Sequence, residues 1–205
     1  MIKLIVFNDG NVTFDYNETG LDSLTDQQKY IESIFGTMAD EEAIDNVKAK
    51  YPELTEEQIL NDLKLIFASA YQEIMPGFLE QMKQANPNIP IAIATEHTKY
   101  VSDYLKDYVD QYYISNEMGF DKNNPLFFQT IINRSGLNPR DILYVDYDIR
   151  NILVAKSVGM SVKQVEEKDL NLGDKVLHTQ LGHRLIDSLI NLKSTRETEN
   201  NTHKL

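Results

Sequence analysis

The sequence predicts an α/β protein with a Rossmann-like parallel sheet as its core and an inserted α-helical cap. Apolar, β-branched runs alternate with helical patterns along most of the chain, which is typical of parallel strands joined by helical crossovers. The alternation stops between about residues 16 and 74, where only helical patterns occur. With 205 residues, 41% of them hydrophobic, the chain is long enough for one core domain plus a modest insertion.

The expected strands are short apolar runs bounded by polar or turn-forming residues. The first covers residues 2–7 and ends at the polar cluster Asn8-Asp9-Gly10-Asn11. Four later runs have the same character: residues 89–94, 112–114, 142–145 and 161–165. Each precedes or follows a helical pattern, so we expect crossover connections and a parallel sheet covered on both faces.

The inserted cap is expected to contain three helical segments. Thr55 and Gln58 form a possible capping box, and Ile59, Leu63 and Ile66 then recur at helical spacing. We interpret this apolar stripe as bundle packing rather than as a ligand-binding surface. The predicted domains are therefore a core of residues 1–15 and 75–192 and a cap of residues 16–74. Residues 193–205 form an expected disordered tail, because residues 193–202 lack apolar side chains.

Composition argues against several classes of partner. Lys and Arg total 20 against 32 Asp and Glu, and the resulting net charge of -12 would repel nucleic acid and anionic membranes. The absence of cysteine excludes disulfides, thiolate metal sites and a cysteine nucleophile. The apolar opening segment breaks at Asn8, too early for a signal peptide core or a membrane span. We therefore expect a cytoplasmic protein.

Candidate functional residues follow the predicted strands. Ligands of open parallel sheets bind beyond the carboxyl ends of the strands, so these positions carry the chemistry. Four segments qualify: Asn8-Asp9-Gly10-Asn11-Val12, Thr95-Glu96-His97, Lys122-Asn123-Asn124-Pro125 and Asp146-Tyr147-Asp148.

These four segments, in this order, resemble the haloacid dehalogenase-like (HAD) hydrolase superfamily. The resemblance covers nearly all of the chain up to the tail, and it is strongest from residue 122 to residue 160. Residues there that follow the family pattern are Lys122, Pro125, Phe128, Gly136, Leu143, Tyr144, Val145, Asp146, Asn151, Ala155, Gly159 and Met160. The resemblance implies an aspartate nucleophile after strand one, an acid/base two residues later, and Mg²⁺ bound between the first and fourth motifs.

The first motif is degenerate in the gapless alignment. Phe7, Val12, Phe14 and Asp15 fall on their family equivalents, which puts Asn8 at the nucleophile position and Gly10 at the acid/base position. An amide has no anionic oxygen to attack phosphorus, and glycine has no proton to give. Both catalytic carboxylates would then be missing.

A one-residue slip gives a second interpretation of the same motif. Asp9-Gly10-Asn11-Val12-Thr13 fits a looser family pattern and makes Asp9 an alternative nucleophile. The slip moves Phe14 and Asp15 out of place, and Asn11 cannot donate a proton as a carboxylic acid does. Asp9 before Gly10 is also an ordinary turn sequence. Both interpretations stay open at the level of sequence.

The other motif positions are carried over from the resemblance one at a time. Thr95 and Lys122 would bind phosphate, although a threonine at this place also caps a helix and a loop lysine is often only a solvated charge. Asp146 is the expected metal ligand. Tyr147 replaces the second acid of the usual pair, for which Asp148 partly substitutes.

The expected function follows from the motif residues that are present and from the two acids that are missing. With Asn8 and Gly10 in place of acids, one carboxylate, Asp146, would face Lys122, and these two charges would neutralise each other without metal. We therefore expect weak Mg²⁺ binding and a catalytically impaired HAD-like protein that binds a small phosphorylated or anionic molecule or a protein partner. The alternative is an active Mg²⁺-dependent phosphatase of a small phosphorylated metabolite that uses Asp9. His97 is expected at the surface.

Overall fold

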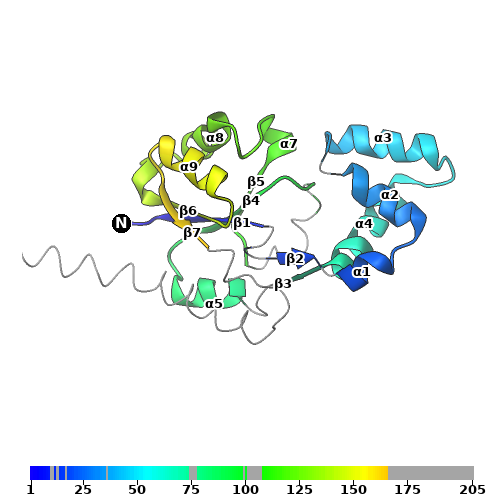
Figure 1. Ribbon diagram of the computed structural model, residues 1–205, viewed down its shortest axis with the longest axis horizontal. Helices are drawn as coiled ribbons and strands as arrows, with labels where there is room; N and C mark the ends of the chain where they lie inside the picture. The colour runs from blue at the N-terminus through cyan, green and yellow to red at the C-terminus, as the bar shows by residue number, and fades with distance from the viewer. Residues whose placement is uncertain are drawn as a thin grey trace, which may run out of the picture.

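The computed structural model contains a five-stranded parallel sheet with helices on both faces (Figure 1). It describes residues 1–9, 12, 14–16, 18–35, 37–73, 78–98, 100 and 108–165. The strands are β1 (Leu4–Asn8), β4 (Ile91–Thr95), β5 (Gln111–Ile114), β6 (Ile142–Asp146) and β7 (Ser161–Gln164). Their order in the sheet is β5-β4-β1-β6-β7, so the predicted Rossmann-like α/β fold is confirmed.

The strand positions agree with the apolar runs of the sequence to within two residues at each end. β1 lies at the centre, where Ile5 pairs in register with Ile91 of β4 and with Leu143 of β6. All five residues of each of β1, β4 and β6 are buried, because helices cover both faces. The three central strands therefore end beside one another at one edge of the sheet.

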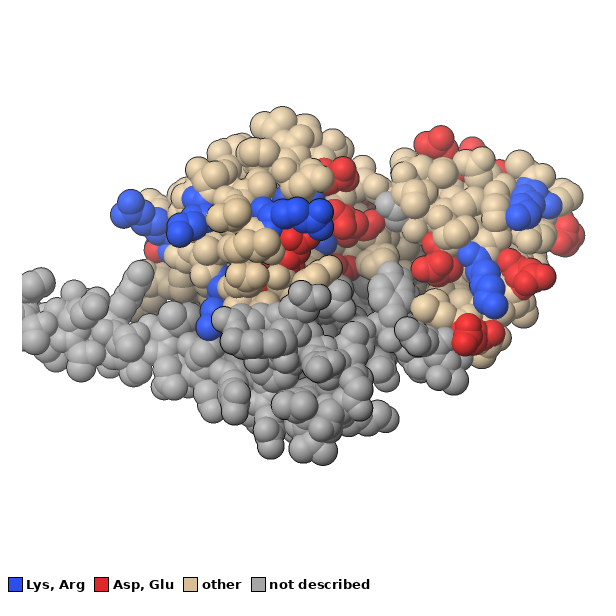
Figure 2. Space-filling view, in the orientation of Figure 1, with Lys and Arg blue, Asp and Glu red and all other residues tan. Residues whose placement is uncertain are grey.

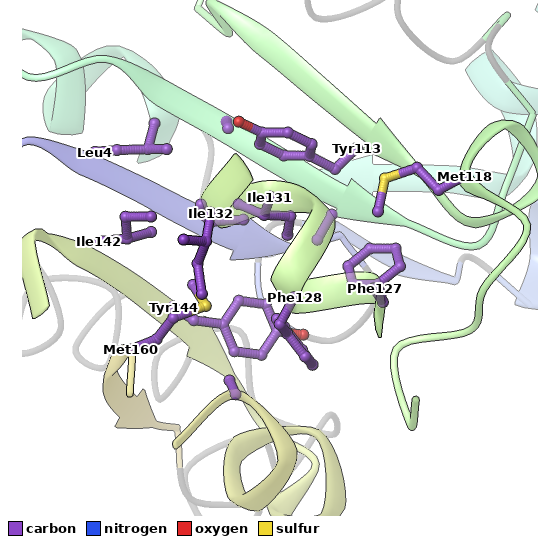
Figure 3. Close-up of a cluster of buried hydrophobic side chains, with 14 of the residues drawn as sticks. Leu4, Tyr113, Met118, Phe127, Phe128, Ile131, Ile132, Ile142, Tyr144 and Met160 are labelled. Carbon is purple, nitrogen blue, oxygen red and sulfur yellow. The ribbon is translucent and has the colours of Figure 1, made fainter. Parts of the chain in front are cut away.

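Alternate side chains of the strands pack against different helices. On one face, α5 (Phe78–Ala85) places Phe78, Leu79 and Met82 against strand residues such as Phe7 and Ile93. On the other face, α8 (Pro125–Ser135) and α9 (Ile149–Ser157) cover the sheet (Figure 1). Figure 3 shows this second core. Its labelled residues are Leu4, Tyr113, Met118, Phe127, Phe128, Ile131, Ile132, Ile142, Tyr144 and Met160.

Local sequence signals explain where α8 begins and ends. The Asn124 side chain accepts a hydrogen bond from the Leu126 backbone N–H, and Pro125 occupies the first turn. Gly136 ends the helix in a left-handed conformation with φ 64°. The short helix α7 (Ser115–Met118) and the 3₁₀ turn η2 (Pro139–Asp141) complete this side of the core. The hydrogen bond of Asn124 at the start of α8 fixes the preceding turn, which carries Lys122.

The cap consists of α1 (Glu18–Asp22), α2 (Asp26–Ile34), α3 (Asp40–Lys50) and α4 (Glu56–Ala70). A two-stranded antiparallel ribbon of β2 (Phe14–Tyr16) and β3 (Tyr71–Glu73) joins the cap to the core. The expectation of helices alone within residues 16–74 was wrong, because both strands extend into that range. The two chain crossings run side by side, and pairing them satisfies their backbone hydrogen-bonding groups.

The cap has a hydrophobic core of its own. Ile31, Ile59, Leu63 and Ile66 are buried in one cluster, as expected from their helical spacing. The capping box is also present at the start of α4: the Thr55 N–H donates to Gln58 Oε1 at 2.8 Å, and the Gln58 N–H donates to Thr55 Oγ1 at 3.3 Å. The cap is thus built as a unit by residues within it.

Contacts between the cap and the core domain include one hydrogen bond and two aromatic ring pairs. The Asn116 side chain donates a hydrogen bond to the Met38 carbonyl oxygen at 2.7 Å. Phe67 of α4 meets the ring of His97 edge-on at 6.3 Å, and Phe35 meets Tyr100 at 6.5 Å. The cap residues therefore contact the segments that follow β4 and β5. Within the described part of the chain, no helix is long and apolar enough to cross a membrane.

Candidate functional site

The candidate site lies at the carboxyl edge of the sheet, where three strands end. Asn8, Thr95 and Asp146 are the last residues of β1, β4 and β6, and all three are buried. Lys122 reaches the same place from the turn before α8 and is only 4% exposed. Residues that are far apart in sequence therefore meet here, as the parallel topology predicted.

The Lys122 ammonium group is the centre of the site. It donates a hydrogen bond to the Asn8 amide oxygen at 2.5 Å, and it lies 3.7 Å from a carboxylate oxygen of Asp9. A third contact, also at 3.7 Å, is with Glu96. The expectation that Asp146 is the one carboxylate facing Lys122 was wrong: Asp9 and Glu96 lie within ion-pairing distance of its ammonium, while the Lys122 charge also lowers the pKa of Asp146. Asp9 and Glu96 directly follow β1 and β4 and so lie nearer.

Asp9 contributes a buried carboxylate to the site. Its side chain is 8% exposed, and its two oxygens face different partners. Oδ1 lies near Lys122, while Oδ2 accepts a short hydrogen bond from the Thr95 hydroxyl. Because burial removes water from this carboxylate, its charged form depends on the hydrogen bonds and opposite charge that its protein partners provide.

His97 completes the network around Asp9. Its Nε2 lies 3.7 Å from Asp9 Oδ2, and its backbone N–H donates to Thr95 Oγ1 at 2.9 Å. The His97 side chain is half-buried, with 26% of it exposed, and its ring contacts Phe67 of the cap. Its neighbour Glu96 is 54% exposed, so these two residues lie on the solvent side of the site.

Asp146 lies deeper and is surrounded by hydrogen-bond donors. Its carboxylate accepts from the Tyr144 hydroxyl, from the Asp148 backbone N–H at 3.0 Å and from the Asn151 side chain at 2.9 Å. Burial raises the pKa of Asp146, although these donors and the Lys122 charge oppose the shift. Burial also raises the pKa of the Tyr144 hydroxyl, with a further contribution from the Asp146 charge.

Asp148 has a structural task at the start of α9. Its side chain accepts from the Arg150 backbone N–H at 2.8 Å and forms an ion pair with the Arg150 guanidinium at 2.6 Å. The hydrogen bonds from Arg150 lower the pKa of Asp148. Among the described residues, no three acidic or histidine side chains are grouped to hold a metal ion. The carboxylates of Asp146 and Asp148 already have protein partners in this arrangement, and their role as metal ligands stays a prediction.

Two residues of the candidate segments contribute to the site although the sequence assigned them no role there. Glu96 and His97 follow Thr95 directly, so their place after a strand was the available signal, but nothing local indicated which way their side chains turn. Gly10, the predicted acid/base position, lies outside the described residues, as does the expected tail of residues 193–205.

The sequence matches no protein-family model and no curated protein. Solved structures do resemble the fold. A predicted HAD-like family hydrolase from Porphyromonas gingivalis has a TM-score of 0.59 and 22% identity over 81% of this chain and 92% of that one. A HAD family enzyme from Bacteroides thetaiotaomicron, in complex with magnesium and inorganic phosphate, has a TM-score of 0.58 and 14% identity over 81% and 95%.

A third structure broadens the chemistry found on this fold. The L-2-haloacid dehalogenase from Xanthobacter autotrophicus, with chloropropionic acid covalently bound, has a TM-score of 0.54 and 17% identity over 80% of this chain and 78% of that one. The likeness shows that this chain has the HAD-like α/β fold. Because one fold hosts several chemistries, the activity has to be argued from the residues of the site.

Proposed function

We propose that this chain is a catalytically impaired HAD-like protein that binds a small phosphorylated or anionic molecule at the carboxyl edge of its sheet. One observation carries the proposal: the side chain that accepts the Lys122 hydrogen bond at the end of β1 is the amide of Asn8. The amide oxygen is uncharged and its nitrogen lone pair is delocalised, so Asn8 does not supply the anionic nucleophile of covalent phosphoryl transfer.

The donors that remain suit an oxyanion. The Thr95 hydroxyl and the Lys122 ammonium are both buried, at 0% and 4% exposure, where hydrogen bonds to a charged group are strong. If magnesium binds, Asp146 and Asp148 would be the residues to hold it, and its charge would help to neutralise a bound phosphate. We expect the metal to bind weakly to the free protein, because the described carboxylates of Asp146 and Asp148 already have other partners.

The binding proposal is tested by calorimetry with inorganic phosphate on wild type, Lys122→Gln and Thr95→Val. We expect saturable binding by wild type that either substitution weakens about tenfold or more, since each removes one buried donor. Thermal melts verify that both variants fold. Binding that survives both substitutions unchanged would show that the anion binds elsewhere.

An active phosphatase that uses Asp9 is the second candidate. The specific observation in its favour is that the Asp9 carboxylate is buried between Thr95 and Lys122, the two residues that the HAD resemblance assigns to phosphate. The deciding measurement is Mg²⁺-dependent hydrolysis of an aryl phosphate. Robust wild-type turnover that Asp9→Asn abolishes and Asn8→Ala leaves intact would establish this candidate in place of the first.

A further inference from the structure

The Asp9 carboxylate already contacts the groups that would bind a phosphate. One of its oxygens accepts the hydrogen bond of the Thr95 hydroxyl and lies 3.7 Å from His97 Nε2. The other lies 3.7 Å from the Lys122 ammonium. A carboxylate and a phosphate group present similar oxygens to such donors, so Asp9 occupies them as an external anion would.

The negative charge of Asp9 should weaken the binding of a phosphate at this place. An incoming phosphate would meet the negative charge of Asp9 at close range, in a buried place where water and salt screen little. Glu96 contacts the same ammonium at the same distance, 3.7 Å, but its side chain is 54% exposed and can turn into solvent. Asp9, at 8% exposure, is enclosed.

We propose that Asp9 is a built-in occupant of the anion site and its main determinant of charge selectivity. A doubly charged oxyanion binds more tightly once the Asp9 charge is removed or its side chain is displaced from Thr95 and Lys122. Ligands with a weaker negative charge, or with a cationic group to meet Asp9, are favoured in its presence. This inference rests on the proposed function, because it concerns the same donors.

The test is calorimetry with inorganic phosphate on wild type, Asp9→Asn and Glu96→Gln at one pH and salt concentration. Asparagine keeps the size of Asp9 and an oxygen that accepts from Thr95, while it removes the charge. We expect Asp9→Asn to bind phosphate about tenfold more tightly or better than wild type, because the removed charge is buried. Glu96→Gln is the matched control, and we expect a change of about threefold at most, because exposed charges are screened.

The outcomes separate this inference from the proposed function. If Asp9→Asn binds phosphate more tightly than wild type and Glu96→Gln does not, the result supports both the inference and the proposed function. If wild type binds phosphate and Asp9→Asn binds it no better, the inference is overturned and the proposed function stands. An equal gain in both variants overturns the inference as well, since it shows a general charge effect. If neither wild type nor Asp9→Asn binds, both fail.

Discussion

Asn8 and Asp9 have nearly the same shape, but they differ in charge and in the protons they carry. Asn8 accepts a hydrogen bond from Lys122, and Asp9 accepts one from Thr95, so two adjacent residues are hydrogen-bonded to the donors of the site. At the scale of single residues, the chemistry is decided by which of the two positions carries the carboxylate.

Asn8→Asp is predicted to create hydrolytic activity. The new carboxylate would lie within hydrogen-bonding reach of Lys122, where Asn8 is now 2.5 Å from the ammonium, and it would provide both a nucleophile and a possible Mg²⁺ ligand. We expect Mg²⁺-dependent turnover of an aryl phosphate about tenfold or more above wild type, because an activated leaving group needs little acid catalysis.

Asn8→Ala is the control for this prediction, because it removes the same amide without adding a charge. Its turnover should stay at the wild-type level. If Asn8→Asp folds and binds Mg²⁺ but shows no turnover above Asn8→Ala, position 8 is not placed for attack on phosphorus.

At the scale of elements, helix ends place the site. The turn that carries Lys122 is held by the Asn124 cap of α8, and the loop after β6 is held by Asp148, which caps α9. The ion pair with Arg150 lowers the pKa of Asp148. Local sequence chemistry of this kind positions groups whose function depends on distant partners.

Comparing Asp148→Ala with Asp148→Asn should separate two contributions of Asp148 to stability: its hydrogen bond at the start of α9 and its negative charge. At pH 7 we expect Asp148→Ala to lower the free energy of unfolding by about 1 kcal/mol. Asp148→Asn keeps the hydrogen bond at the start of α9, so it should lower the free energy of unfolding by less. Because the folded-state pKa of Asp148 is below its ordinary value of 3.8, its charge contributes stability above that pH.

This contribution is lost as the pH falls through the folded-state pKa. The difference between wild type and Asp148→Asn should therefore shrink in urea titrations carried out progressively below pH 3.8. A difference that stays constant across this window would show that the Asp148 charge contributes nothing to stability.

At the scale of the whole molecule, the cap is a small bundle with its own hydrophobic core, and among the described residues it contacts the core domain through Phe35, Met38 and Phe67. The face of the cap visible in Figure 2 carries Asp and Glu side chains with Lys between them. Such a bundle can move against the core without losing its internal packing, and the residues it contacts, His97 among them, belong to the site.

Asn116→Ala should loosen the cap without unfolding it. The substitution removes the 2.7 Å hydrogen bond to the Met38 carbonyl oxygen, worth about 1 kcal/mol, and leaves the hydrophobic cores of the sheet and of the cap intact. Hydrogen exchange measured by mass spectrometry should become faster around residue 38 and in α2 and α3, while α8 and α9 stay unchanged.

The matched control is Ser33→Ala, which removes a hydrogen bond made within the cap, from the Ser33 hydroxyl to the Tyr30 carbonyl oxygen at 2.8 Å. We expect its effect to stay within α2. Equal acceleration in the cap and in the core after Asn116→Ala would mean that the two do not separate.

The sequence by itself determined the α/β fold, the strands, the capping box at Thr55 and the lack of a carboxylate at position 8. These follow from interactions between near neighbours or from residue identity, so they can be predicted from local pattern. The ribbon of β2 and β3 was missed because its short strands depend on pairing across the whole cap.

Only the tertiary structure decided which side chains share a partner at the sheet edge. Lys122 and Asn8 are 114 residues apart, and Thr95 and Asp9 are 86 apart, so no local pattern relates them. Asp9, Glu96 and His97 follow their strands in loops, where side-chain direction depends on packing. The parallel topology brings the strand ends together, but packing decides that Lys122 lies within ion-pairing distance of Asp9 and Glu96, while Asp146 accepts hydrogen bonds from Tyr144 and Asn151.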